Sequence, residues 1–188
     1  MNVFEEFMTL REVVIDKGKI TMDRQRIILL PVNFLGRYSI KLAQNPEIAR
    51  KLYDAMKKGM IEYSQPLGKE YALTYRDFLD RWVKYCAFGG WGLVEYELVE
   101  NEKNFGYLRV RNLPLHLYLK QMGVKEPSDV IFEGLIAGSA SGTFRTDIDV
   151  IEVKCVCSGD TECIYYWGSR DYLREKFPEM SEKRFGSE

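Results

Sequence analysis

The stretch that decides the predicted fold is Ile151-Glu-Val-Lys-Cys-Val-Cys-Ser-Gly-Asp-Thr-Glu-Cys163. The turn-forming residues Ser158-Gly-Asp-Thr161 separate two strand-like runs, which predicts an antiparallel hairpin from Ile148 to Gly168. Facing strands lie about 5 Å apart, and zinc–thiolate bonds are about 2.3 Å long. Cysteines on the two arms are therefore close enough to share one metal ion.

Three cysteines of this hairpin are candidate metal ligands on spacing alone: Cys155, Cys157 and Cys163. If the first strand continues to Cys157, then Cys155 and Cys157 point to the same face, because strand side chains alternate with a period of two. The spacing differs from the standard zinc-finger forms. It favours metal binding by at least two of these cysteines, with small core residues or a redox-sensing thiol pair as the alternatives.

A glycine-rich helix is predicted just before the hairpin. It begins at Pro127-Ser-Asp129, since serine caps helices well and an acid suits the first turn, and it runs to about Phe144. Gly134, Gly138 and Gly142 recur at four-residue intervals. Each glycine inside a helix costs about 0.8 to 1 kcal/mol relative to alanine. Three on one stripe predict that another backbone or a ligand approaches closely, and close packing is the favoured interpretation.

The rest of the chain alternates between helix-like and strand-like patterns. Apolar residues recur every three or four positions between Asn33 and Phe88, which predicts three helices with breaks at Asn45-Pro46 and Gln65 to Gly68. Short strands are expected from Gly18 to Pro31, and a hairpin is expected from Leu93 to Arg111. A short helix is expected from His116 to Met122. The predicted fold class is α+β, with helices packed on an antiparallel sheet in a single domain.

Composition and charge restrict the possible partners. The chain has 188 residues and is 46% hydrophobic, and 27 Lys and Arg against 28 Asp and Glu give a net charge of −1. This balance lacks the basic character of nucleic-acid binding, so no direct nucleic-acid partner is expected. No run of about 18 apolar residues suggests a membrane span, and the acidic start Met1 to Met8 is unlike a secretory signal. A cytoplasmic location is predicted, where cysteines stay reduced.

His116 is the only histidine and lies in the apolar run Leu113-Pro-Leu-His-Leu-Tyr-Leu119. One interpretation is a haem or metal ligand, and the favoured one is a half-buried histidine with satisfied hydrogen bonds. No Gly-x-Gly-x-x-Gly or phosphate-loop pattern indicates a nucleotide site. Aromatic residues make up 13% of the chain, which suits a pocket for an apolar or aromatic ligand whose position the spacing does not fix.

Three stretches of the second half resemble the 4-vinyl reductase domain family: Gly89-Gly-Trp-Gly-Leu-Val-Glu-Tyr-Glu97, Phe132-Glu-Gly-Leu-Ile-Ala-Gly138 and Glu152-Val-Lys-Cys-Val-Cys-Ser-Gly-Asp-Thr-Glu-Cys163. The resemblance covers roughly Lys51 to Gly168. That family is related to the sensor domains of phenol- and xylene-responsive activators and to Golgi transport-particle subunits, and it implies the ligand-binding fold shared with NO-signalling proteins. The expected organisation is an N-terminal extension (1–50) packed on the core, a ligand-binding domain (51–170) and a C-terminal tail (171–188).

The resemblance also implies a metal site. In the aromatic sensors a structural zinc is held by one glutamate and three cysteines, and Glu152, Cys155 and Cys163 match three of these ligands. The glycine spacing places Asp129 at the position of the remaining cysteine, so that either Asp129 or Cys157 would complete the site. Glu152 and Cys155 have opposite strand parity, and both can face one metal only at a bulge or a strand end.

The function implied by the resemblance is that of a zinc-stabilised sensor or carrier domain. Such a domain would enclose a small hydrophobic molecule, form a homodimer and act through a separate output protein. One alternative is a reductase or accessory protein acting on a vinyl-tetrapyrrole, but the sequence has no nicotinamide or flavin motif, which favours a protein that is not itself a catalyst. The other alternative is a dimeric assembly subunit.

Overall fold

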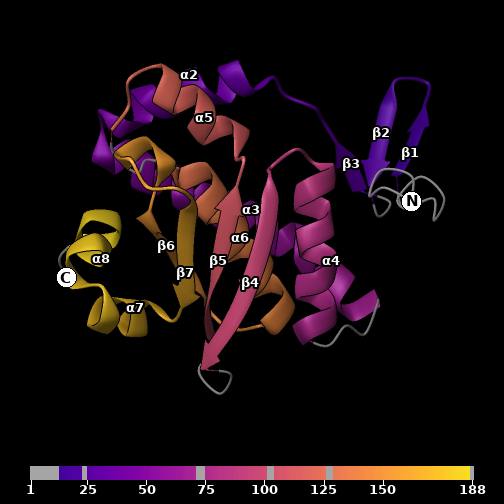
Figure 1. Cartoon of the computed structure of the whole chain (residues 1–188). Helices are drawn as coiled ribbons and strands as arrows, with labels where there is room; N and C mark the ends of the chain where they lie inside the picture. The colour runs from indigo at the N-terminus through magenta and orange to yellow at the C-terminus, as the bar shows by residue number, and fades with distance from the viewer. Residues whose placement is uncertain (1–12, 23–24, 71–74, 101–103, 126–128, 187–188) are drawn as a thin grey trace.

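A four-stranded antiparallel sheet forms the centre of the molecule, with helices on its inner face (Figure 1). The computed structural model describes residues 13–22, 25–70, 75–100, 104–125 and 129–186. The sheet has the order β4-β5-β7-β6, and its strands are β4 (Leu93–Glu100), β5 (Phe105–Arg111), β6 (Asp149–Lys154) and β7 (Cys163–Gly168). The predicted α+β class and both predicted hairpins are confirmed.

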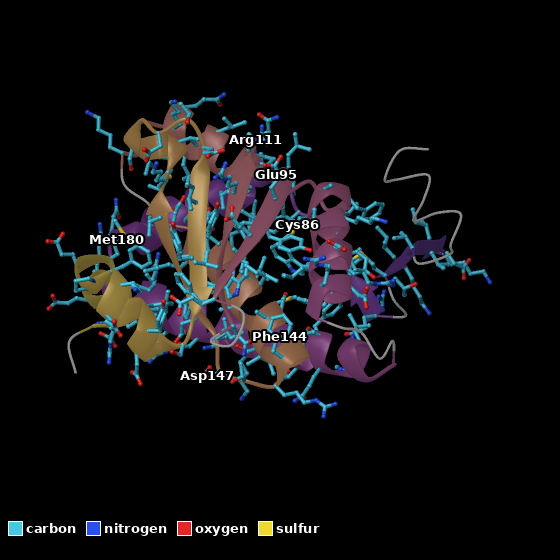
Figure 2. The ribbon with its side chains drawn as sticks, turned by 60° about the horizontal axis from the view of Figure 1, so that its bottom comes forward. Cys86, Glu95, Arg111, Phe144, Asp147 and Met180 are labelled. Carbon is cyan, nitrogen blue, oxygen red and sulfur yellow. The ribbon has the colours of Figure 1, made fainter. Side chains whose placement is uncertain are left out.

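Alternation along β4 and β5 separates an apolar inner face from an outer face with charged residues. On the inner face Leu108 and Val110 of β5 are fully buried against the helices. On the outer face Glu95 of β4 pairs with Arg111 of β5, and Figure 2 labels both. The inner face carries the main core, and a second, smaller apolar cluster with Phe105 and Ile151 lies on the other face.

Helices α3 (Pro46–Glu70) and α6 (Val130–Phe144) pack along each other behind the sheet. A Cβ atom added to Gly138 would lie 2.3 Å from the Lys57 carbonyl oxygen, and one added to Gly142 would lie 2.1 Å from Ser64 Oγ. These distances leave no room for a side chain. The glycine stripe therefore exists to let two helix backbones approach, which confirms the close-packing interpretation.

The remaining helices surround this pair. They are α2 (Val32–Ala43), α4 (Tyr75–Phe88), α5 (Pro114–Gln121), α7 (Arg170–Lys176) and α8 (Pro178–Phe185). Helix α4 lies beside β4, α2 lies against α5, and α7 and α8 lie at the β6 side of the sheet (Figure 1). Over the residues that the structure describes, none of these helices is long and apolar enough to cross a membrane.

The N-terminal strands form a separate small sheet. Strands β1 (Val13–Asp16), β2 (Lys19–Met22) and β3 (Gln25–Ile27) pair in that order, and the Gln25 side chain donates a hydrogen bond to the Tyr63 carbonyl (2.8 Å). The predicted strand region does not extend to Pro31, because strand pairing ends at Ile27. The apolar residues that follow are exposed.

Helix α3 continues through Pro66, so the predicted helix break at Gln65 to Gly68 is wrong. Proline removes one backbone hydrogen bond, but tertiary packing holds this turn. Leu67 is buried, and Ser64 Oγ is 3.4 Å from the Gly138 carbonyl oxygen of α6. Packing against α6 therefore outweighs the local preference to end the helix.

The free edge of β6 is hydrogen bonded by side chains instead of by another strand. Three backbone N–H groups at alternate positions donate to side-chain oxygens of α3 and α6: Ile148 to Ser141 Oγ (3.0 Å), Val150 to Tyr53 Oη (3.1 Å) and Glu152 to Glu133 Oε1 (2.8 Å). Buried N–H groups need partners, and these helices supply them. Strand β6 is thereby fixed against both helices along its length.

Candidate metal centre

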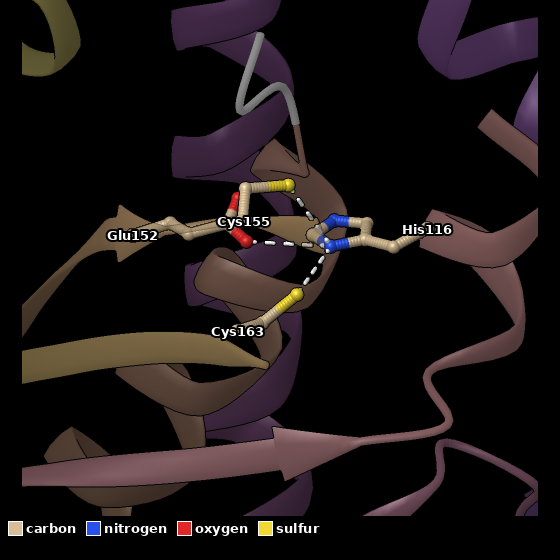
Figure 3. Close-up of side chains that lie close together, drawn as sticks. All are labelled: His116, Glu152, Cys155 and Cys163. Atoms are coloured by element: carbon tan, nitrogen blue, oxygen red, sulfur yellow. Dashed lines mark hydrogen bonds and ion pairs between the residues drawn. The ribbon is translucent and has the colours of Figure 1, made fainter. Parts of the chain in front are cut away.

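Four buried side chains from three elements converge at one end of the sheet. His116 comes from α5, Glu152 from β6, Cys155 from the residue after β6, and Cys163 from the start of β7 (Figure 3). One potential ligand atom from each side chain lies within 4.8 Å of all the others. The structure thus brings three of the predicted ligands, Glu152, Cys155 and Cys163, together with a histidine.

His116 Nδ1 lies at the centre of this cluster. It is 2.9 Å from Cys163 Sγ, 3.4 Å from Cys155 Sγ and 3.3 Å from Glu152 Oε1. Metal bonds of 2.0 to 2.3 Å in a tetrahedron give ligand-to-ligand distances of about 3.3 to 3.8 Å. Two of the three distances from Nδ1 fall within this range and the third is shorter, so the four side chains are close enough to hold one ion.

A bulge and a strand end bring Glu152 and Cys155 to the same side. The register between β6 and β7 shifts between Glu152 and Lys154, and β6 ends at Lys154. The Cys155 N–H then donates to Asp160 Oδ2 (2.9 Å), which closes the turn. Glu152 and Cys155 have opposite strand parity, and the bulge and the strand end together allow both side chains to face the same point.

Cys157 lies outside the group of four. The predicted strand does not reach it, because a single 3-10 turn, η2 (Val156–Ser158), follows Cys155. The Cys157 backbone N–H donates to Cys155 Sγ (3.4 Å), and its thiol donates to the His116 carbonyl oxygen (3.3 Å). All four cysteines of the chain are free thiols.

Asp129 faces the opposite side of the His116 ring. Its Oδ1 accepts the Phe132 N–H (2.9 Å), so Asp129, and not the predicted Ser128, is the cap of α6; Ser128 lies outside the described residues. Its Oδ2 lies 3.3 Å from His116 Nε2. A carboxylate on the second ring nitrogen is the usual support of a metal-binding histidine.

The electrostatics of the cluster favour added positive charge. Burial lowers the pKa of His116, but its hydrogen bonds to Asp129 and Cys155 outweigh burial and raise that pKa to about 11. Hydrogen bonds from Cys157 and Cys163 hold the pKa of Cys155 far below its usual value, and donation to Cys155 raises the pKa of Cys163. The side chains thus stabilise a thiolate beside a cation.

The Glu152 carboxylate supplies the test of whether a metal fits. It is 4% exposed, and within the described residues neither of its oxygens has a hydrogen-bond partner. Burial raises its pKa, opposed by His116. A buried carboxylate without partners is costly, whereas imidazole, carboxylate and thiolate together are donors for a metal ion. The cluster could therefore hold one.

A small apolar cavity lies between α4, α6 and the sheet. Aromatic and aliphatic side chains line it, together with one serine: Phe78, Leu79, Trp82, Leu108, Ile136, Ser139, Ala140, Phe144 and Trp167. Figure 2 labels Phe144 at the end of α6. The free volume is about 10 Å³, roughly what one water molecule requires. The Ser139 hydroxyl is buried and finds no hydrogen-bond partner among the described residues.

Tilted and edge-on ring contacts connect this cavity to the cluster. Ring centroids are 6.2 Å apart between Trp82 and Phe132, 5.3 Å between Phe132 and Tyr165, and 6.4 Å between Tyr165 and His116. Phe132 lies one helical turn from Asp129 and two turns from Ser139. Helix α6 therefore contributes to both sites.

The sequence did not identify His116 as part of the cluster. The favoured interpretation was a half-buried, satisfied histidine, whereas the side chain is fully buried and its Nδ1 faces Glu152, Cys155 and Cys163. A usable signal was present, because the resemblance lacked one ligand and the chain has a single histidine. Combining those two facts would have made His116 a candidate.

Comparisons with known proteins identify the fold. No protein-family model matches the sequence, and no curated protein sequence is significantly similar to it. The phenol-responsive sensory domain of the transcription activator PoxR, solved with phenol, superposes with a TM-score of 0.73 at 16% identity over 96% of both chains. A trafficking protein particle complex subunit 3 from Naegleria fowleri, covalently bound to palmitic acid, gives 0.53 at 13% identity over 73% of this chain and 93% of the other.

A third similar structure belongs to the group that the sequence resembles. A vinyl-4-reductase family protein from Methanocaldococcus jannaschii gives a TM-score of 0.49 at 17% identity, over 75% of this chain and 82% of that one. The predicted relationship to the phenol sensors and to the transport-particle subunits is thus confirmed at the level of the fold. At these identities the likeness establishes a shared fold, and residue roles rest on the geometry given above.

Proposed function

We propose that this protein is a sensor or carrier domain for a small hydrophobic molecule, stabilised by a structural zinc ion. The observation that carries the proposal is the buried set of His116, Glu152, Cys155 and Cys163, in which the Glu152 oxygens have no hydrogen-bond partner among the described residues. The fold shared with a phenol-responsive sensory domain and with a palmitate-bound trafficking subunit supports the ligand-binding part.

Zinc is the metal that suits this donor set. Two thiolates, one imidazole and one carboxylate favour zinc over the harder cations, which prefer oxygen. Four protein ligands leave no open position for a substrate or water, as in structural zinc sites. The ion would join α5 to the hairpin of β6 and β7, two parts of the chain that are far apart in sequence.

Asp129 and Cys157 have supporting roles in this proposal, although either was a candidate fourth ligand. Asp129 orients the His116 ring from Nε2, at 3.3 Å, while Nδ1 faces the metal position. The Cys157 N–H donates to Cys155 Sγ at 3.4 Å, an arrangement that stabilises a metal-bound thiolate. Both residues would therefore tune the site from outside the coordination sphere.

The cavity between α4 and α6 is the proposed ligand site. Its free volume of about 10 Å³ is far below the roughly 300 Å³ of small ligand pockets, so binding requires side chains such as Trp82 and Phe144 to move apart. Ser139 is its one hydroxyl, and it lacks a partner within the described residues. We infer a small hydrophobic ligand with a single hydrogen-bonding group.

Exposed apolar residues before and within α2 support a homodimer. Ile28 is 77% exposed, Leu29 is 71% exposed and Phe34 is 61% exposed, in one continuous segment. Exposed apolar patches of this kind mark interaction surfaces, and isologous dimers are the commonest assembly. The N-terminal extension (1–50) would contribute this surface, the domain (51–170) would hold the ligand, and a separate protein would provide the output.

Native mass spectrometry tests the proposal in one experiment. We expect the folded protein to have the mass of two chains with about one zinc ion each, and denaturation to return the bare chain. Removing the metal with a chelator should lower the melting temperature, because metal-binding energy contributes directly to folding. A folded protein that carries no zinc after purification in zinc-containing buffer would contradict the metal site, and a strictly monomeric mass would contradict the dimer.

A further inference from the structure

Glu133 joins the C-terminal helix to the strand that carries a proposed metal ligand. It lies on α6 and is 1% exposed. Its Oε1 accepts the backbone N–H of Glu152 (2.8 Å), and its Oε2 forms an ion pair with Arg184 of α8. Glu133 is not one of the four clustered donors, so its role lies in this bridge between α8 and β6.

The bridge depends on the charge of Arg184. Burial raises the pKa of Glu133, while Arg184 and the Glu152 N–H oppose this effect. The neighbouring acids Asp129 and Glu152 repel the Glu133 carboxylate. If Arg184 were withdrawn, Glu133 would become a buried carboxylate beside two others, and such a group is costly to leave unpaired.

Helix α8 packs against α7 and β6. Ser181 is its buried residue, and Phe185 packs edge-on against Tyr53 at 6.1 Å and lies 4.8 Å from the Arg170 guanidinium. Met180, labelled in Figure 2, is 42% exposed. Arg184 adds a charged link from α8 to α6 to this packing.

We propose that the Glu133–Arg184 ion pair couples metal binding at Glu152 to the docking of α8, so that the C-terminal helix reports whether the metal centre is occupied. This inference rests on the proposed metal site. With the metal bound, the Glu152 side chain is fixed, and its backbone N–H stays on Glu133. Without the metal, the Glu152 carboxylate has only His116 Nδ1 beside it, at 3.3 Å, so the Glu152 side chain and the end of β6 are held less firmly against Glu133.

Thermodynamic linkage makes this coupling reciprocal. If docking of α8 strengthens metal binding by some factor, metal binding must strengthen docking of α8 by the same factor. Removing the partner of a residue that supports a metal ligand typically weakens metal binding by about 10-fold to 100-fold. We therefore expect about a tenfold effect in each direction.

The test compares Arg184→Gln with Glu182→Gln, which removes a charge from an exposed position of the same helix. Zinc affinity is measured by competition with a chromophoric chelator, and docking of α8 is measured by amide hydrogen exchange with and without zinc. Arg184→Gln should weaken zinc binding about tenfold and abolish the zinc-dependent protection of α8. Glu182→Gln should leave both properties unchanged.

Glu133→Gln provides a second variant if Arg184→Gln does not fold, since glutamine keeps an acceptor for the Glu152 N–H and removes the charge that Arg184 pairs with. It should release α8 in the presence of zinc. Wild-type zinc affinity together with α8 exchange that ignores zinc would overturn the coupling and leave the metal site standing. A wild-type protein that binds no zinc would overturn the metal site and the coupling with it.

Discussion

Asp149 and Glu152 are two buried carboxylates on the same strand, with exposures of 1% and 4%, and the fold treats them differently. Asp149 Oδ1 accepts from Tyr53 (2.8 Å) and Lys57 (2.7 Å), and its Oδ2 accepts from Arg170 (2.8 Å). Glu152 has no hydrogen-bond partner for either oxygen within the described residues. The chain thus surrounds one buried acid with three donors and gives the other a single neighbouring donor, His116 Nδ1, which lies 3.3 Å from Glu152 Oε1.

The two pKa values follow the same contrast. Burial raises the pKa of both groups, but the hydrogen bond from Arg170 and the charge of Lys57 outweigh burial at Asp149 and lower its pKa. At Glu152 burial dominates, and its pKa is raised despite His116. Variants that change the partners of either carboxylate therefore test whether the two groups contribute differently to stability.

The largest effect is expected from Cys163→Ser. The variant should lose the metal and with it roughly 3 to 5 kcal/mol of unfolding free energy, because metal binding contributes to folding and Glu152 is left with only His116 beside it. Metal content and urea denaturation measure the two quantities. Cys157→Ser is the matched control and should retain the metal. Metal loss in Cys157→Ser and retention in Cys163→Ser would invert the proposed ligand set.

A pair of charge-neutralising variants tests the contrast directly. Asp149→Asn should lower the unfolding free energy by about 3 kcal/mol whether or not metal is present, because Arg170 loses its carboxylate partner and Lys57 keeps only the exposed Asp147. Glu152→Gln should destabilise the metal-loaded protein but leave the metal-free protein unchanged or more stable. Denaturation of both variants with and without zinc gives the four unfolding free energies to be compared. A Glu152→Gln variant that is equally destabilised in both conditions would show that no ion completes this site.

The partners of Asp149 depend on the close approach of α3 to α6, and Gly138→Ala tests this dependence. The new Cβ would lie 2.3 Å from the Lys57 carbonyl oxygen, so α3 must shift. We expect a loss of about 1 to 3 kcal/mol, as for overpacked cores. Gly59→Ala is the control on α3, where nothing among the described residues lies within 4 Å, and it should stabilise the helix by about 1 kcal/mol. Equal effects at both positions would contradict the packing role.

The smallest effect is expected from acid. The pKa of Asp149 is lowered from 3.8 in the folded protein, so the unfolded chain binds this proton first as the pH falls. The stability that Asp149 contributes is therefore fully present above pH 3.8 and is lost as the pH drops through the folded value. The difference in unfolding free energy between wild type and Asp149→Asn should shrink over that range. A constant difference down to lower pH would show that the charge of Asp149 is not what its partners recognise.

Features set by local sequence could be predicted, and features set by distant contacts could not. The hairpin around Gly159 and the stripe from Gly134 to Gly142 follow from turn chemistry and helix periodicity, and both occur as expected. The low helix preference of Pro66 predicts a break, but the helix continues through it because α3 packs against α6 at this point. Tertiary contact decided that position.

The candidate site divides in the same way. Cys155 and Cys163 lie close in sequence, and one hairpin pairs their strands, so their convergence could be anticipated. His116 is separated from Cys163 by 47 residues, yet its Nδ1 lies 2.9 Å from that sulfur. No pattern within α5 encodes this contact, because it arises from how α5 packs over the end of the sheet. The sequence could therefore make His116 a candidate, but only the structure places it beside Cys163.

The side-chain bonds along β6 also affect how the protein associates with copies of itself. An exposed edge strand offers unpaired N–H groups to any passing chain, which is a route to aggregation. At β6 the hydroxyls of Ser141 and Tyr53 and the carboxylate of Glu133 already occupy the alternate N–H groups from Ile148 to Glu152. A strand rich in valine and isoleucine is thereby prevented from recruiting a foreign strand, and extension of this sheet is left to the β4 side.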